Sequence, residues 1–259
     1  MDDRRRALKT QVKRFARALG IKGRRDRRAV SVPPDFDEST TRILHAVSAY
    51  TMTNPESVEA LVNAVRYLVA NGVAGDIVEC GVWRGGSSMA AALALKELGE
   101  EHRHLYLYDT FEGMSSPTEE DVSALDGVSA AGQFAAARLT DDSSDWCRAP
   151  LDDVRANLQS TGYPQDRVHF VKGKVEATIP ATIPSGAIAL LRLDTDWYES
   201  TRHELQHLYP RLARGGVLII DDYGHWAGAR KAVDEYFAAH PPALLLNRVD
   251  YTARIAVKL

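Results

Sequence analysis

Residues 190–196, LLRLDTD, and residues 217–223, VLIIDDY, are two apolar runs that each stop in a pair of acids. The acids are Asp194 and Asp196 after the first run, and Asp221 and Asp222 after the second. Such runs are typical of strands that are buried on both faces of a parallel sheet. The carboxyl ends of parallel strands share one edge, so we expect the four acids to meet there.

Crowded carboxylates repel one another unless a cation lies between them. Asp194, Asp221 and Asp222 offer only hard oxygen ligands, which predicts a metal site for Mg²⁺ or another hard divalent cation rather than zinc. Asp196 is placed to act as a general base, and His225 is a second candidate for that catalytic role. The alternative is that some of these acids cap helices or pair with Arg192 or Arg202.

Upstream, residues 76–88, DIVECGVWRGGSS, form an expected strand that leads through a glycine loop into a helix. The loop lacks the G-x-G-x-x-G spacing of dinucleotide sites. It also carries Glu79 two positions before Gly81, and an acid there suits a cationic ammonium better than a diphosphate. The pattern therefore favours S-adenosylmethionine over a nicotinamide cofactor. Backbone N–H groups near Gly86–Ser88 are placed to receive the donor's carboxylate.

A second strand, residues 105–109, ends in Asp109 about thirty residues after Glu79. An acid at this position is suited to ribose hydroxyls. The alternative is that Asp109 only caps the turn at residues 111–113.

Strands and helices alternate through the rest of the chain. Further strands are expected at 168–172, 187–194, 217–221 and 253–259, and helices at 55–70, 86–98, 151–160, 200–212 and 227–239. This order predicts an α/β fold with a doubly wound, mostly parallel sheet and helices on both faces. Gly215 and Gly216 are expected to terminate the helix at 200–212.

We expect a basic arm and cap segment at 1–53, followed by one catalytic domain at 54–259. The long stretch 111–150 interrupts the alternation and is expected to be a lid over the cofactor.

Composition places the 259-residue chain among ordinary globular proteins, with 45% hydrophobic and 26% charged residues. Its two cysteines make neither a disulfide framework nor a zinc site, and neither a secretory signal nor a membrane span is evident, which predicts a cytoplasmic location.

The charge is uneven. Residues 1–28 hold twelve Lys and Arg and three Asp, although the whole chain carries a net charge of −3. Leu8, Val12, Phe15 and Leu19 follow a helical spacing. Membrane contact through this arm is conceivable but less favoured than a tail, or a helix lying on the protein's own oligomer. Nothing in the sequence indicates a nucleic-acid partner.

Five motifs give the chain a resemblance to a known family. They are YTMT at 50–53, ECGVWRGGSS at 79–88, LYLYDTFEGM at 105–114, LRLDTDWYEST at 191–201 and GGVLIIDDY at 215–223. In this order they resemble the macrocin O-methyltransferase (TylF-type) family, from about Tyr50 to about Phe237.

The resemblance implies a class I methyltransferase fold with a largely parallel, seven-stranded sheet. It also implies an S-adenosylmethionine-dependent and Mg²⁺-dependent O-methyltransferase that acts on a hydroxyl of a deoxysugar in natural-product or nucleotide-sugar biosynthesis. The family's metal aspartates fall on Asp194, Asp221 and Asp222, and its proposed base falls on Asp196. Members often form homodimers or larger homo-oligomers.

The predicted cofactor contacts lie in four parts of the chain. They are Thr51, Glu79, Gly81, Arg84, Gly85, Ser87, Asp109, Thr110, Phe111, Gly173 and Val175. The acceptor is expected to be a sugar-bearing small molecule whose identity the sequence leaves open. The basic arm slightly favours an anionic acceptor, such as a nucleotide sugar.

Two other functions are alternatives to this one. An NAD(P)-dependent oxidoreductase on a similar sheet is the main alternative, although the glycine spacing disfavours it. A non-catalytic relative would lack the acids at the sheet edge, and all of them are present.

Overall fold

The computed structural model describes residues 31–241 and 244–259. The predictions made for the basic arm at 1–28 concern residues outside this part of the chain.

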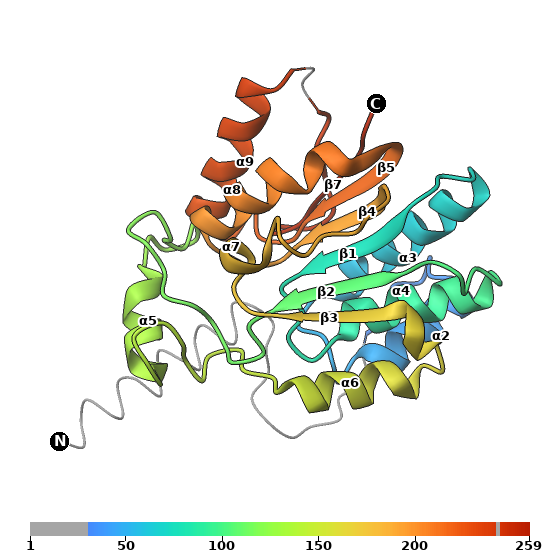
Figure 1. Ribbon diagram of the computed structural model, residues 1–259, viewed down its shortest axis with the longest axis horizontal. Coiled ribbons are helices and arrows are strands. Elements are labelled where there is room, and N and C mark those ends of the chain that lie inside the picture. The colour runs from blue at the N-terminus through green and yellow to red at the C-terminus, as the bar shows by residue number, and fades with distance from the viewer. Residues whose placement is uncertain (1–30, 242–243) are drawn as a thin grey trace.

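A seven-stranded sheet forms the centre of the molecule, in the order β3-β2-β1-β4-β5-β7-β6 (Figure 1). The strands are β1 (Asp76–Cys80), β2 (Leu105–Asp109), β3 (Val168–Lys172), β4 (Ile188–Leu193), β5 (Leu212–Ile220), β6 (Asn247–Arg248) and β7 (Arg254–Val257). β1 to β5 are parallel, whereas β7 runs antiparallel to both β5 and β6. This confirms the predicted mostly parallel, seven-stranded α/β sheet.

Helices cover both faces of the sheet (Figure 1). One face carries α2 (Glu38–Val47), α3 (Pro55–Ala70), α4 (Gly86–Glu97) and α6 (Leu151–Ser160). The other carries α7 (Val175–Thr178), α8 (Tyr198–His207) and α9 (Ala227–Ala239). Successive strand residues alternate between the two cores, so Ile77 packs in the first and Val78 in the second.

The start of α3 follows from its sequence. Asn54 accepts a hydrogen bond from the backbone N–H of Ser57 at 2.9 Å, and Pro55 occupies the first turn, where a missing N–H costs nothing. Helix α2 lies in the segment predicted as a cap, yet Ile43, Leu44 and Val47 are buried in the core shared with α3 and α4.

The predicted helix at 200–212 is wrong at its second half. Helix α8 ends at His207, a short 3-10 turn covers Tyr209–Arg211, and Leu212 already begins β5. Pro210 explains the early end, because proline lacks the N–H that an α-helix interior requires. Gly215 and Gly216 therefore lie inside β5 and do not terminate a helix.

The segment 111–150 holds one helix, α5 (Ala130–Ala137), and lies beside the carboxyl edge of the sheet (Figure 1). Within residues 31–241 and 244–259, no helix has both the length and the apolar character needed to cross a bilayer.

Candidate active site

A cavity of about 360 Å³ opens at the carboxyl edge of the parallel strands. This edge is where open α/β sheets bind ligands, and the volume falls within the range of small-molecule sites. Among the predicted residues, those that line the cavity are Thr51, Glu79, Gly81, Ser87, Asp109, Thr110, Gly173, Val175, Asp194, Asp196, Asp221, Asp222 and His225. Arg84, Gly85 and Phe111 do not line it.

The loop after β1 crosses very close to the end of β4. Gly81 has a φ of +82°, and a Cβ at this position would lie 1.9 Å from the carbonyl oxygen of Asp194. The backbone N–H of Asp194 also donates to the carbonyl of Cys80 at 2.8 Å. Only glycine fits there, and this fit places the predicted donor loop directly beside the DTD motif.

The N-terminus of α4 is covered by the segment around Tyr50. Gly86 donates its backbone N–H to the carbonyl of Tyr50 at 3.0 Å, and a Cβ on Gly86 would lie 2.5 Å from that oxygen. The hydroxyls of Thr51 and Thr53 are 2.9 Å apart. The YTMT segment therefore packs on the glycine loop and contributes Thr51 to the cavity wall.

Asp109 organises the loops on either side of it. One carboxylate oxygen accepts the backbone N–H groups of Val82 at 2.7 Å and Trp83 at 3.0 Å, and the other accepts that of Phe111 at 2.6 Å. Trp83 and Phe111 adopt positive φ angles of 47° and 53°. These hydrogen bonds hold two strained turns. Burial raises the pKa of Asp109, whereas the backbone donors lower it.

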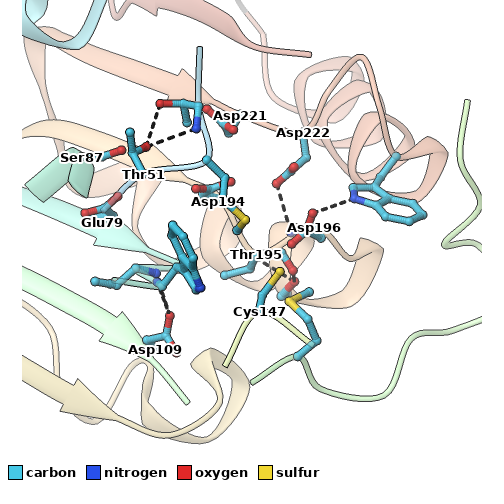
Figure 2. Close-up of a pocket in the computed structure, with 18 of the residues that line it drawn as sticks. Thr51, Glu79, Ser87, Asp109, Cys147, Asp194, Thr195, Asp196, Asp221 and Asp222 are labelled. Carbon is cyan, nitrogen blue, oxygen red and sulfur yellow. Dashed lines mark hydrogen bonds between the residues drawn. The ribbon is translucent and has the colours of Figure 1, made fainter. Parts of the chain in front are cut away.

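The three residues predicted as metal ligands lie together, as Figure 2 shows for Asp194, Asp221 and Asp222. Each offers a carboxylate oxygen, and these oxygens lie within 4.8 Å of one another. The ends of β4 and β5 bring them together, because Leu193 pairs with Ile220 in the parallel register. Burial raises the pKa of Asp194 and of Asp222, and the neighbouring acids raise it further.

Arg192 lies at the centre of the acids, and the sequence did not predict it as a site residue. Its side chain is buried, and Nη1 donates to Glu79 at 2.8 Å and to Asp194 at 2.6 Å, while Nη2 donates to Asp221 at 2.9 Å. From the sequence, Arg192 was predicted only as a possible ion-pair partner of the acids, in the alternative to a metal site. The available signal was a charged residue inside the apolar run LLRLDTD, since a buried arginine is nearly always paired.

Both carboxylate oxygens of Glu79 are hydrogen-bonded, and Arg192 bonds the first of them. Its second oxygen accepts the hydroxyl of Ser88, so the acid lines the cavity while it bonds two neighbours.

Asp196 is fixed in an unusual conformation, with a φ of +69°. Its backbone N–H donates to Asp222 at 3.1 Å, and its carboxylate accepts the indole N–H of Trp226 at 2.6 Å (Figure 2). Burial raises the pKa of Asp196 to about 8, with a further contribution from Asp194. Burial lowers the pKa of His225, whose Nδ1 lies 3.3 Å from the hydroxyl of Tyr251.

Arg84 acts outside the cavity. Its guanidinium binds both carboxylate oxygens of Asp153 on α6, at 2.8 and 3.1 Å, and donates to the carbonyl of Ala49 at 3.1 Å. It therefore ties the glycine loop to α6 and to the segment before Tyr50.

The insertion 111–150 forms the wall opposite the glycine loop. Met114, Gln133, Trp146 and Cys147 line the cavity from this segment. Trp146 packs edge-on against Trp197 and Trp226, with ring centroids 5.5 and 6.2 Å away. The insertion is therefore a built part of the site, and its predicted role as a lid stays a prediction.

Comparison with known proteins identifies the family. Residues 3–257 match the family described as macrocin O-methyltransferase (TylF). The chain belongs to the macrocin O-methyltransferase family. This confirms the resemblance and the prediction that the protein is an O-methyltransferase, and it removes the support for an oxidoreductase.

Individual relatives are also O-methyltransferases. The chain is 37% identical over 204 residues to the 8-demethyl-8-(2,3-dimethoxy-alpha-L-rhamnosyl)-tetracenomycin-C 4'-O-methyltransferase of Streptomyces olivaceus, covering 79% of this chain and 74% of the relative. It is 35% identical over 192 residues to the mycinamicin III 3''-O-methyltransferase of Micromonospora griseorubida, covering 74% and 72%. The solved structure of the O-methyltransferase NovP superposes with a TM-score of 0.70 at 31% identity, covering 81% of this chain and 82% of that one.

Proposed function

We propose that this protein transfers a methyl group from S-adenosylmethionine to a hydroxyl of a sugar-bearing small molecule. The observation that carries the proposal is one cavity in which the glycine loop of a methyltransferase family meets four carboxylates at the ends of β4 and β5. The names of two relatives specify hydroxyls of glycosylated natural products, which supports a sugar acceptor in natural-product biosynthesis.

The donor is proposed to lie over the loop from Gly81 to Ser87. Its carboxylate would meet the N-terminus of α4, where backbone N–H groups favour an anion. Its ribose would lie against Asp109. Oδ2 of Asp109 accepts two backbone N–H groups, whereas Oδ1 accepts one. The Thr110 hydroxyl lies 3.4 Å from Oδ1 but is closer to the carbonyl of Gly113, at 2.7 Å, so Oδ1 is the oxygen proposed to accept a ribose hydroxyl.

Asp194, Asp221 and Asp222 are proposed to hold a hard divalent cation. The fit rests on three buried or half-buried carboxylates whose oxygens lie within 4.8 Å of one another, a donor set that suits Mg²⁺. When bound, such an ion makes a coordinated hydroxyl more acidic and orients it. Arg192 uses one oxygen of Asp194 and one of Asp221, so each carboxylate keeps a second oxygen.

Asp196 is proposed to take the proton of the acceptor hydroxyl. It lines the cavity next to Asp194, and the indole of Trp226 fixes its carboxylate. The acceptor oxygen would then attack the methyl carbon in line with the carbon–sulfur bond, so that the O–C bond forms as the C–S bond breaks. S-adenosylhomocysteine would leave with the electron pair on its sulfur, and the proton would remain on Asp196. His225 is the second candidate, since its lowered pKa keeps the imidazole neutral and able to accept a proton.

The charge of the cavity bears on the acceptor. Eight acids line it, namely Glu79, Asp109, Glu176, Asp194, Asp196, Asp221, Asp222 and Asp250. Among the lining residues that the structure describes, Lys174 is the one lysine or arginine, and it pairs with Asp142 at 2.5 Å. Arg192 bonds three of these acids, and the proposed cation would offset more of their charge. The expectation of an uncharged glycoside, rather than the nucleotide sugar that the basic arm slightly favoured, therefore rests on the glycosylated natural products named for two relatives.

The test is a transfer assay with methyl-labelled S-adenosylmethionine and matched acceptors. One acceptor carries a deoxysugar on an uncharged aglycone, and the other carries the same sugar on a nucleoside diphosphate. We expect label on a sugar hydroxyl of the uncharged glycoside. Absence of transfer to every sugar-bearing acceptor would contradict the proposed function, and preference for the nucleotide sugar would contradict the expected acceptor class. The homo-oligomer and the cytoplasmic location stay predictions.

A further inference from the structure

Arg192 connects two parts of the site, namely the donor loop and the acid cluster that is proposed to bind the cation. Glu79 belongs to the donor loop after β1, whereas Asp194 and Asp221 belong to the acid cluster after β4 and β5. One guanidinium bonds all three carboxylates, at 2.8, 2.6 and 2.9 Å. The side chains of Arg192 and Glu79 are each only 4% exposed, so these contacts are shielded from water.

The geometry of the bonds leaves a specific set of atoms available. Arg192 bonds Oδ2 of Asp194 and Oδ1 of Asp221, and within the described part of the chain it has neither a hydrogen bond nor an ion pair with Asp222. The other oxygens of Asp194 and Asp221 remain for an ion. A planar guanidinium fixes the orientation of the carboxylates it binds, which a point charge such as an ammonium does much less well.

We propose that Arg192 is a positioning residue that sets the orientation of the donor-side acid Glu79 and of the ligand acids Asp194 and Asp221 together. The inference rests on the proposed function for what binds at each half. In the folded chain without ligands, the guanidinium keeps these acids from turning apart. Both binding events therefore meet carboxylates that are already oriented.

A simpler reading makes Arg192 only a counter-charge for buried acids. The two roles give different predictions for Arg192→Lys, which keeps the positive charge but loses the planar set of N–H donors. A counter-charge role predicts unchanged ion affinity in this variant. A positioning role predicts weaker binding at both halves, since loss of outer-shell partners commonly costs about 10–100-fold in metal affinity.

The experiment measures two affinities without any turnover. Mn²⁺ binding is followed by electron paramagnetic resonance, and S-adenosylhomocysteine binding by calorimetry, for the wild type and Arg192→Lys. We expect about tenfold or greater weakening for Mn²⁺ and a loss of several-fold for S-adenosylhomocysteine. Asp222→Asn, whose residue does not contact Arg192, should weaken Mn²⁺ binding and leave S-adenosylhomocysteine within about twofold.

Arg230→Lys is the matched control. Arg230 donates to the carbonyls of Tyr223 and Gly224 near the same strand end. Among the described residues it makes no hydrogen bond or ion pair with Glu79, Asp194 or Asp221, so both affinities should stay at wild-type values. Circular dichroism checks that the variants fold. If Arg192→Lys does not fold, the double variant Arg192→Lys/Glu79→Gln is compared with Glu79→Gln. The two have equal charge, so a counter-charge role predicts equal Mn²⁺ affinity, whereas the inference predicts about tenfold weaker Mn²⁺ binding in the double variant.

Mn²⁺ and S-adenosylhomocysteine affinities within twofold of wild type in folded Arg192→Lys would overturn the inference. A wild type that binds no Mn²⁺ would instead overturn the proposed metal site. In that case the inference is decided by S-adenosylhomocysteine alone, because Glu79 lies on the donor side.

Discussion

At the scale of single residues, Asp196 and His225 compete for the role of base. Both line the cavity, but only Asp196 lies in the DTD motif. The backbone N–H of Asp196 donates to the carboxylate of the proposed ligand Asp222, whereas that of His225 donates to the backbone carbonyl of Asp222. The strained φ of +69° at Asp196 is maintained by bonds to Asp222 and Trp226, and such strain is common at functional sites. These contacts favour Asp196.

Asp196→Asn is expected to lower kcat by about 10²–10⁴-fold, the usual contribution of a general base, while His225→Gln lowers it by less than about tenfold. In the wild type kcat should rise with pH as Asp196 loses its proton. Its pKa of about 8 falls when a cation binds nearby, so the rising limb should lie below that pH. Kinetics of both variants from pH 5.5 to 9 provide the measurement. A larger loss in His225→Gln would reverse the assignment.

Asp109→Asn is expected to weaken S-adenosylhomocysteine binding by about 1.5–3 kcal/mol. It removes a charged acceptor that holds the N–H groups of Val82, Trp83 and Phe111. Calorimetry measures the effect. An unchanged dissociation constant would mean that Asp109 neither shapes the loop nor meets the ribose.

How far the sequence predicts these residues depends on the kind of signal. Acids at the ends of apolar strands are visible because strand ends share an edge, so Asp194, Asp221 and Asp222 could be grouped in advance. The bonds of Arg192 could not, because they depend on which face of β4 the side chain takes and on the register between β1 and β4, where Glu79 pairs with Arg192. The same limit applies to Arg84, whose partner Asp153 lies 69 residues away.

At the scale of elements, the crossing between the β1 loop and the end of β4 creates the site. Gly81 and Gly72 offer a matched comparison, since both have positive φ, at +82° and +61°. A Cβ on Gly81 would lie 1.9 Å from the carbonyl oxygen of Asp194, whereas one on Gly72 meets nothing within 4 Å.

Gly81→Ala is therefore expected to abolish S-adenosylhomocysteine binding or to prevent folding. Gly72→Ala should cost only about 1–2 kcal/mol of unfolding free energy, the penalty for alanine in a left-handed conformation, and should leave binding intact. Thermal unfolding and calorimetry on both variants test this. Equal stability and equal S-adenosylhomocysteine affinity in the two variants would show that the close contact between Gly81 and the carbonyl of Asp194 is unimportant.

The ends of helices and strands were predictable where the local sequence changes from apolar to polar residues or to glycine and proline. Strands β1, β2 and β3 and helices α6 and α9 begin and end at the predicted residues. The error at α8 arose because the leucine spacing continued through Leu212, although Pro210 had already interrupted the helix. The wall formed by α5 and Trp146 was not predictable in detail, because it depends on contacts between distant segments such as Ser123 and Trp226.

At the scale of the whole molecule, the buried acids make stability depend on pH and on cations. The folded-state pKa of Asp196 is raised to about 8, so the folded state binds its proton more tightly than the unfolded chain does. Stability from this group is present below the unfolded pKa and is lost as the pH rises through about 8. The buried histidines with lowered pKa, such as His225, act in the opposite sense, but only below about pH 6.5.

The protein in EDTA is therefore expected to lose about 1.5 kcal/mol between pH 6.5 and pH 8 through Asp196 alone. This corresponds to a fall in Tm of roughly 3–6 °C. Asp196→Asn should flatten this dependence, and Mg²⁺ should raise Tm more at pH 8, where the acids are ionised. Scanning calorimetry at both pH values measures the effect. A Tm that rises with pH over this range would contradict it.

Asp194, Asp221 and Asp222 are proposed to gather around a cation next to the methyl donor. Transfer of label from S-adenosylmethionine to a sugar-bearing acceptor, measured in EDTA and again after Mg²⁺ is restored, tests this most directly. We predict that transfer stops in EDTA and returns with Mg²⁺ in the wild type but does not return in Asp222→Asn. Undiminished transfer in EDTA would contradict the account.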